Sequence, residues 1–155
     1  MLPMFLAFII APFAPMCVVN AGRMPTEGQS YREMFDKADL VVIATAVETK
    51  DTNEHLKLLN SVNVVGVETQ FKTRLIIKGP KNLKQFVLHH YREPNGEFVE
   101  NGPALIHIPG GQHPDFVLFL LRETDGRYAP ITGQTDPLLF SVLELKGAVQ
   151  SEEQK

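Results

Sequence analysis

Three of the five histidines in this chain could act together as ligands for a transition metal. Imidazole nitrogen suits zinc and copper, and a site needs three or four such donors close together. His89 and its neighbour His90 fall in a strand-like run, where adjacent side chains point to opposite faces. None of the short metal-binding spacings such as H-E-x-x-H is present. We therefore expect histidines at the surface or rim of the fold and no cofactor, and we keep a metal site of His89, His107 and His113 as an alternative.

Basic residues are grouped along a long segment in which apolar and polar residues alternate, and along the residues that follow it. Such a group can bind a partner, although its default interpretation is a solvated sheet face. We do not expect nucleic-acid binding, because single-strand binders stack bases on aromatic side chains and Phe71 points away from Lys72 and Arg74. The candidate binding residues are Lys72 and Arg74, with Gln112 and His113 from a loop. The whole basic group is Lys72, Arg74, Lys78, Lys81 and Lys84.

No catalytic motif accompanies these residues. Neither Ser61 nor Ser141 lies in the G-x-S-x-G pattern of a hydrolase nucleophile. The Gly-Gly pair within Pro109–Pro114 lacks the Gly-Lys-Ser/Thr ending of a phosphate-binding loop. The sequence therefore predicts no catalytic residues and a protein that is not an enzyme.

Hydrophobic patterns predict the elements that must position these side chains. Ser30 and Glu33 form a capping box, which favours a short helix over Ser30–Lys37. The run Leu40–Val47 is apolar on both faces and predicts a central strand, whereas Asp51–Asn60 is polar and is interpreted as a loop or a weak helical turn.

The segment Val62–Ile77 has the clearest strand pattern. Alternate residues are apolar and polar over its length, so one face should be buried and the other solvated. Gly66 is a candidate bulge, because a strand this long must bend. The predicted buried face consists of Val65, Val67, Thr69, Phe71, Thr73, Leu75 and Ile77.

The second half of the chain predicts further strands. Asp125-Gly126 fits a tight hairpin that returns through 127–131, and 94–96 is a turn. Together these elements predict a mainly β domain: a small, five-stranded, partly closed antiparallel barrel with one short N-terminal helix. The remaining strands are expected at Phe86–Tyr91, Phe116–Leu121 and Leu138–Leu145, with a mixed segment at Glu97–Ile108.

The first 21 residues carry no charge and end in a small-x-small site, Val19-Asn20-Ala21, which is typical of an export signal. Proline interrupts the segment, so it falls short of the about 20 apolar residues of a stable membrane span. An anchor, or a lipid on Cys17, remains as an alternative. We therefore expect a secreted or periplasmic protein with a signal at 1–21, a flexible segment at 22–29, a barrel domain at 30–147 and a frayed tail at 148–155.

Net charge and cysteine content limit the partners. The formal net charge is −3 and none of it lies in the leader, so the domain as a whole is not built to condense on nucleic acid or anionic lipid. Cys17 is the single cysteine, so the exported part holds no disulfide. That absence favours a bacterial envelope protein over a small animal secreted domain.

Three segments together resemble a known family. They are the helix feeding Lys37–Val47, the long strand Glu68–Gly79 ending in Lys-Gly, and a glycine-containing loop before Phe116–Leu121, followed by Tyr128 and Gly133. This pattern is similar to bacterial relatives of the netrin module and of the tissue inhibitors of metalloproteinases, and it would cover Tyr31–Leu145. The resemblance implies an OB-fold barrel.

The inhibitory mechanism of that family does not carry over. It uses an N-terminal, disulfide-bonded cysteine to chelate the zinc of the protease, and no cysteine follows Cys17 here. Fold transfers more safely than function. We therefore expect an exported, non-enzymatic binding domain whose partner is a protein or an envelope polymer. A histidine-based metal-binding module, or a protease inhibitor with a different mechanism, is the alternative.

Export of the protein should yield a product that begins at Gly22, because cleavage is expected after Val19-Asn20-Ala21. Intact-mass measurement of the secreted protein tests this. A mass that retains residues 1–21, or that includes a lipid on Cys17, would contradict it.

Overall fold

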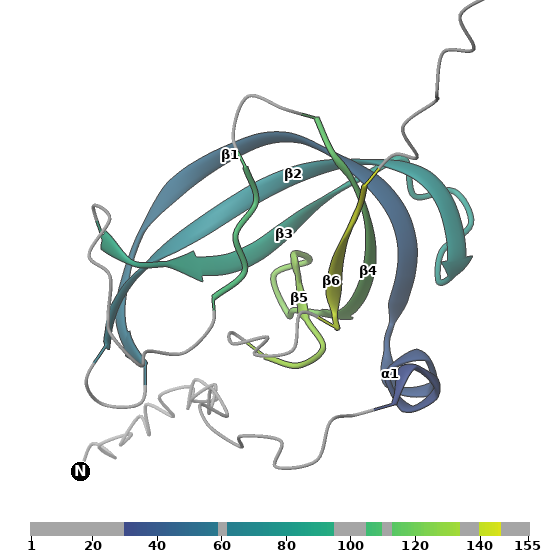
Figure 1. Ribbon diagram of the computed structural model, residues 1–155, viewed down its shortest axis with the longest axis horizontal. Helices are drawn as coiled ribbons and strands as arrows, with labels where there is room; N and C mark the ends of the chain where they lie inside the picture. Colours follow the sequence, from purple (N-terminus) through teal and green to yellow (C-terminus); the bar gives the residue numbers. More distant parts are fainter. Residues whose placement is uncertain (1–29, 59–61, 95–104, 110–112, 134–139, 147–155) are drawn as a thin grey trace, which may run out of the picture.

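A computed structural model describes residues 30–58, 62–94, 105–109, 113–133 and 140–146 (Figure 1). One short helix, α1 (Tyr31–Lys37), precedes the strands β1 (Leu40–Leu58), β2 (Val62–Lys78), β3 (Gln85–Arg92), β4 (Asp115–Arg122), β5 (Tyr128–Pro130) and β6 (Val142–Leu145). The predicted leader, flexible segment and tail, most of the turn predicted at 94–96 and most of the mixed segment predicted at Glu97–Ile108 lie outside these residues. The expectation of a mainly β protein with one short helix is confirmed.

The capping box predicted from the sequence forms at the start of α1. The Glu33 backbone N–H donates to Ser30 Oγ, and the Ser30 backbone N–H donates to the Glu33 carboxylate. The helix places Met34 and Ala38 over Val41 and Phe119, where these side chains form a small core on the outer side of the sheet. The helix therefore covers one end of β1 and β4, as the apolar character of Leu40–Val47 predicted.

The first strand is more than twice as long as the sequence indicated. It continues through 51–58, so the prediction of a loop or a helical turn over Asp51–Asn60 is wrong for that part. Pairing with β2 explains the difference, since Leu56, Lys57 and Leu58 lie opposite Val64, Asn63 and Val62. A polar segment becomes strand here because the partner strand satisfies its backbone.

Gly66 marks a bulge, but the extra residues belong to β1. The register moves from Asp51↔Val67 to His55↔Val65, so β1 bends out where β2 does not. A Cβ built on Gly66 would come within 2.4 Å of Thr52 Oγ1 and 2.8 Å of Glu54 Cβ. The glycine is needed because the neighbouring strand approaches so closely.

A further bulge at Arg74 reverses the sidedness of β2 near its end, and another follows at Ile77. The neighbouring β1 residues Ile43 and Ala44 pair with Leu75 and Thr73, so Arg74 between them has no partner on β1. In the same way, Ile77 has no partner because Val41 and Val42 pair with Lys78 and Ile76. Ile76 consequently packs against the main core. Leu75 and Ile77, predicted to be buried, are 56% and 49% exposed, so the prediction is wrong at these two positions.

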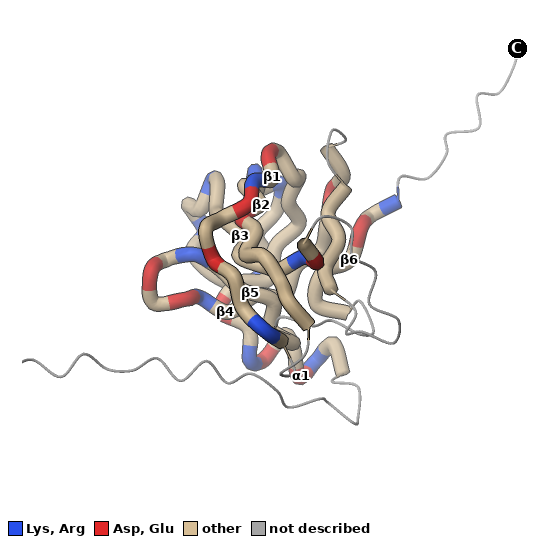
Figure 2. The backbone as a smooth tube through the Cα atoms, turned by 90° about the vertical axis from the view of Figure 1, so that its left-hand side faces the viewer, with Lys and Arg blue, Asp and Glu red and all other residues tan. Residues whose placement is uncertain are grey.

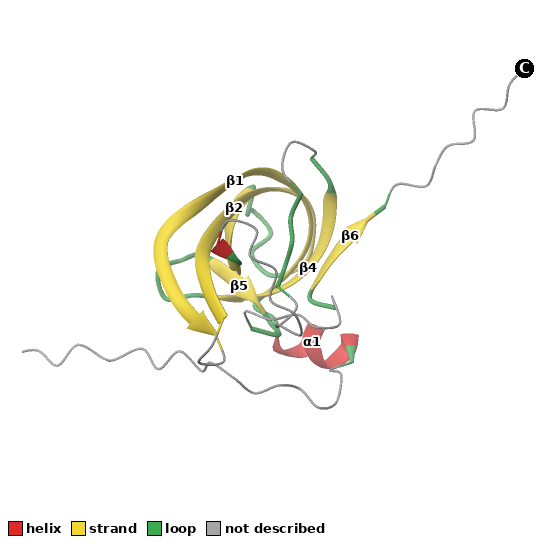
Figure 3. Cartoon of the chain, turned by 60° about the vertical axis from the view of Figure 1, so that its left-hand side comes forward, coloured by secondary structure: helices red, strands yellow, loops and turns green. Residues whose placement is uncertain are grey.

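Five strands form a closed ring in the order β1-β2-β3-β5-β4, and β4 pairs back onto β1 (Figure 3). The predicted hairpin is confirmed, since β4 and β5 pair antiparallel around Gly126, whose φ is +94°. Two features differ from the expected five antiparallel strands. β3 meets β5 in parallel at the single pair Leu88↔Tyr128, and β6, which forms within the strand predicted at Leu138–Leu145, pairs with β4 outside the ring. The extra strand is possible because 115–118 of β4 bond β1 on one edge and β6 on the other.

The interior of the ring holds the main hydrophobic core. Phe71 is fully buried there, stacks on Phe86 at 5.4 Å between ring centroids and meets Phe116 edge-on at 5.8 Å. Such aromatic contacts add to the stabilisation from burial. The predicted burial of Val65, Val67, Thr69 and Phe71 is therefore confirmed.

Replacement of Phe71 by alanine should lower the free energy of unfolding by about 3–5 kcal/mol, because a large cavity is left among three rings. The adjacent Lys72 is exposed, so Lys72→Ala should change it by less than about 0.5 kcal/mol. Urea unfolding of both variants measures the difference. Equal effects at the two positions would contradict the observed register.

Candidate functional site

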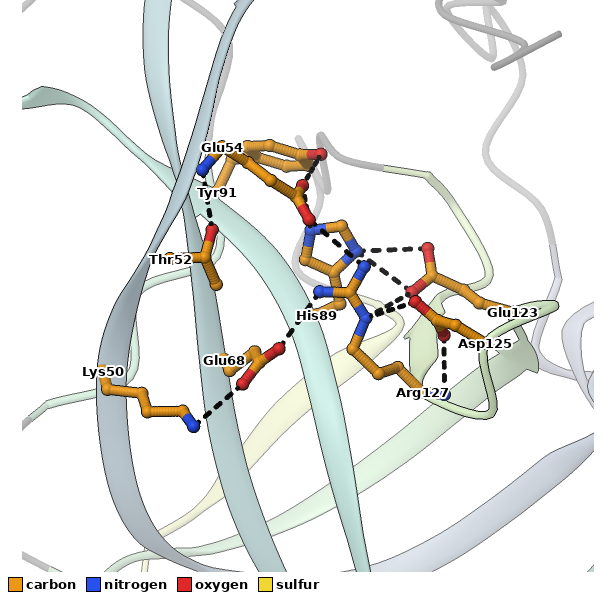
Figure 4. A network of polar contacts seen from close by, with 9 residues as sticks. All are labelled: Lys50, Thr52, Glu54, Glu68, His89, Tyr91, Glu123, Asp125 and Arg127. Carbon is orange, nitrogen blue, oxygen red and sulfur yellow. Dashed lines mark hydrogen bonds and ion pairs between the residues drawn. The ribbon is translucent and has the colours of Figure 1, made fainter. Parts of the chain in front are cut away.

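A network of charged side chains covers the outer face of β1, β2 and β3 next to the β4–β5 hairpin (Figure 4). The backbone register explains its position, because Lys50, Glu68 and His89 lie opposite one another on three neighbouring strands. The hairpin completes it with Glu123, Asp125 and Arg127, and in Figure 2 two acidic segments lie between two basic segments along this hairpin.

Arg127 is the centre of the network. Its Nη1 lies 3.2 Å from Glu68 Oε1 on β2, and its Nη2 lies 3.3 Å from Glu54 Oε1 on β1. Its Nε lies 2.8 Å from Asp125 Oδ2 within the hairpin. One guanidinium with several N–H donors can satisfy carboxylates from different elements at once. The hairpin is thereby held against the faces of β1 and β2.

His89 makes a second link between the hairpin and β1. Its Nδ1–H donates to Glu123 Oε2 at 3.0 Å, and its Nε2 lies 3.0 Å from Glu54 Oε2 as an ion-pair contact. Both ring nitrogens thus face carboxylates, which favours the doubly protonated ring. Burial opposes that charge, but the hydrogen bond and the charge of Glu123 outweigh it and raise the pKa of His89.

His90 lies on the opposite face of β3 and has the opposite electrostatic environment. It is 3% exposed, and its Nε2 lies 2.9 Å from Thr69 Oγ1 inside the ring. Burial, reinforced by the nearby charge of His89, lowers the pKa of His90 to about 4. The expectation that both histidines lie at the surface or rim is wrong, because the hairpin covers one face of β3 and the ring encloses the other.

The three histidines of the alternative metal site are not gathered by the fold. His107 and His113 are exposed, whereas His89 is buried with both nitrogens against carboxylates. The Nδ1 of His113 lies 3.1 Å from the backbone oxygen of Ala46. Among the described residues, no group of three or more His, Cys, Asp or Glu side chains is placed to hold a metal ion.

The predicted binding residues meet elsewhere on the outer surface, along the end of β2. Lys72 lies opposite Thr45 of β1, and His113 contacts Ala46, the next residue of that strand. Arg74 is 62% exposed at its side chain and lies 3.7 Å from Asp115. Gln112 lies outside the described residues. Three of the four predicted binding residues are therefore brought to adjacent positions.

Exposed apolar side chains lie among these cations. Leu75 and Ile77 project outward because the bulge at Arg74 shifts the strand by one residue. Leu75 also faces Ile43 across the strands, and Ile43 faces Val117, so the apolar surface continues onto β1 and β4. We call the end of β2 together with the turn that follows it the basic–apolar face, and its cations and exposed apolar side chains are Lys72, Arg74, Leu75, Ile77, Lys78, Lys81 and Lys84.

The charged network and the basic–apolar face differ in how far their charges are paired. In the network, each of the four carboxylates contacts Arg127, and such a set holds elements together. On the basic–apolar face, Lys72, Lys81 and Lys84 are exposed and make no ion pair within the described part of the chain. The first region is suited to positioning the hairpin, and the second has charge available for a partner.

Comparison with protein-family models and with curated proteins finds no match for this chain. Among the described residues, no helix is both long and apolar enough to cross a membrane.

The two adjacent histidines should titrate far apart. His89 has a raised pKa, so its contribution to stability is fully present below its unfolded pKa of about 6.5 and disappears as the pH rises through its folded pKa. His90 has a lowered pKa, so its buried neutral ring costs stability as the pH falls from about 6.5 towards about 4. NMR titration of the ring protons should give a midpoint above about 6.5 for His89 and near about 4 for His90. A midpoint for His89 at or below its ordinary value would show that the carboxylate contacts do not form.

Proposed function

We propose that this chain is an exported, non-enzymatic binding domain with an OB-like barrel, and that it binds an anionic component of the cell envelope through the unpaired lysines of the basic–apolar face. The observation that carries the proposal is the charge distribution over 72–84. This segment holds five of the chain's fifteen basic residues and no acidic residue, although the net charge is −3.

The ring of strands supports the OB-like part of the proposal. An OB-fold is a five-stranded, partly open barrel, and here five strands close a ring with β4 paired to β1. The single β3–β5 pair makes this ring weakest at one place, as expected for a partly open barrel. Resemblance to the netrin and inhibitor relatives agrees with this architecture, but it adds nothing about the partner.

The unpaired lysines support a binding role. Long lysine side chains in solvent attract an opposite charge and accelerate encounter with an acidic partner. Arg74 is held by Asp115, and Lys78 Nζ donates to the backbone oxygens of Phe35 and Asp36 at the end of α1. These two cations help to shape the face, whereas the lysines without partners are the groups that contact the ligand.

Binding to an immobilised anionic polymer tests this proposal. Polyglutamate beads should retain the exported protein at low salt and release it as salt is raised. The double charge reversal Lys72→Glu with Lys84→Glu should reduce retention about tenfold or more, because like charges then meet.

Lys57→Glu is the matched control, since Lys57 is also exposed but pairs with Asn63 near the other end of β2. It should bind polyglutamate as the unchanged protein does. Equal loss in the control and in the double variant, or retention that is insensitive to salt, would contradict a specific basic–apolar face.

A further inference from the structure

We propose that the anionic partner of the basic–apolar face is the surface of a lipid bilayer with anionic headgroups. This inference rests on the proposed function and specifies its partner. The domain would attach peripherally, with lysines at the headgroup phosphates and apolar side chains at the boundary of the acyl chains.

The composition of the face favours lipid over protein. Protein interfaces are depleted in lysine and enriched in tyrosine, tryptophan and arginine. This face has four lysines and one arginine, and that arginine already pairs with Asp115. Amphipathic helices that bind at a membrane interface combine lysine and arginine with leucine or phenylalanine, and this part of the sheet offers a similar combination of residue types.

The bulges of β2 give the exposed apolar residues a specific arrangement. Without them Leu75 would continue the inward series of Phe71 and Thr73, and it would be buried. Instead Leu75 and Ile77 point outward, while Ile76 fills the core. The structure thus displays two large aliphatic side chains in the segment richest in lysine, a combination that a soluble polyanion would not use.

The helix α1 extends the same surface. Lys78 Nζ lies 5.4 Å from the centre of the Phe35 ring and donates to two carbonyl oxygens at the end of α1. Phe35 itself is 38% exposed. This contact fixes the end of β2 beside the helix, so an aromatic ring borders the aliphatic pair.

The distribution of acidic residues would orient the domain. Glu68 lies seven residues before Leu75 on β2, which corresponds to about 20 Å along an extended strand. The remaining carboxylates of the charged network surround Arg127 beside Glu68. A bilayer of negative charge would attract the unpaired lysines of the basic–apolar face, whereas the carboxylates of the network are already paired with cations, which explains how a domain of net charge −3 can bind it.

Vesicle binding separates lipid from other anionic partners. The probe is a preparation of vesicles of phosphatidylglycerol mixed with phosphatidylcholine, and vesicles of pure phosphatidylcholine are the neutral reference. The sample is the exported protein, whose amino terminus is determined by intact-mass measurement. We expect co-sedimentation with the anionic vesicles only. Each removed lysine should weaken binding about fivefold at low salt.

A variant that replaces the two exposed aliphatic side chains distinguishes lipid binding from polymer binding. Leu75→Ser with Ile77→Ser should weaken vesicle binding about tenfold and leave polyglutamate binding unchanged, because only a bilayer accepts the apolar side chains. Leu56→Ser is the control, since Leu56 is 43% exposed on β1 opposite Val64, away from the face. Circular dichroism confirms that each variant is folded.

Each outcome decides between the proposals. Vesicle binding that is unaffected by the serine substitutions, or no vesicle binding while polyglutamate binding persists, would overturn the lipid inference and leave the proposed function standing. If the unchanged protein binds neither the anionic vesicles nor polyglutamate, the lipid inference and the proposed function are both overturned.

Discussion

The structure depends on one constraint: the same stretch of β1 must pair with β2 along one edge and with β4 along the other. Residues 41–45 pair with β4 on one side and with β2 on the other, and this double pairing closes the ring. A continuous pair of long strands cannot curve this far without extra residues, and the bulges supply the bend. Gly66 allows the closest approach, where β1 folds over β2 beside Thr52 and Glu54.

Closure of the ring determines which regions are available for function. Bending brings the β4–β5 hairpin against β1 and β2, where Arg127 and His89 hold it through carboxylates from both strands. The same bending turns Leu75 and Ile77 out of the core at the other end of β2. The charged network therefore has its charges paired internally, whereas the basic–apolar face has unpaired lysines and exposed apolar side chains.

Local patterns predicted the parts of the fold whose determinants are close in sequence. The capping box at Ser30, the alternation that buries Phe71 and the Asp125-Gly126 hairpin all depend on neighbouring residues. Features that depend on distant pairing were missed. Nothing local shows that a polar run after Asp51 will be a strand, or that Ile43 and Ala44 will force a bulge at Arg74.

The candidate site was predicted in part for the same reason. Lys72 and Arg74 were found because a one-sided basic pattern on a strand is visible in the sequence. Glu54 was missed because its segment was interpreted as a loop, and Arg127 because its partners come from β1 and β2. The burial of His89 depends on a hairpin more than thirty residues away, at Glu123.

The most direct measurement of the central claim is NMR line broadening of the protein on anionic vesicles that carry a spin-labelled lipid. The account predicts broadening of amide signals at 72–84 and at the end of α1, with the signals of the hairpin at 123–127 unchanged. Broadening centred on the hairpin, or spread evenly over the chain, would contradict it.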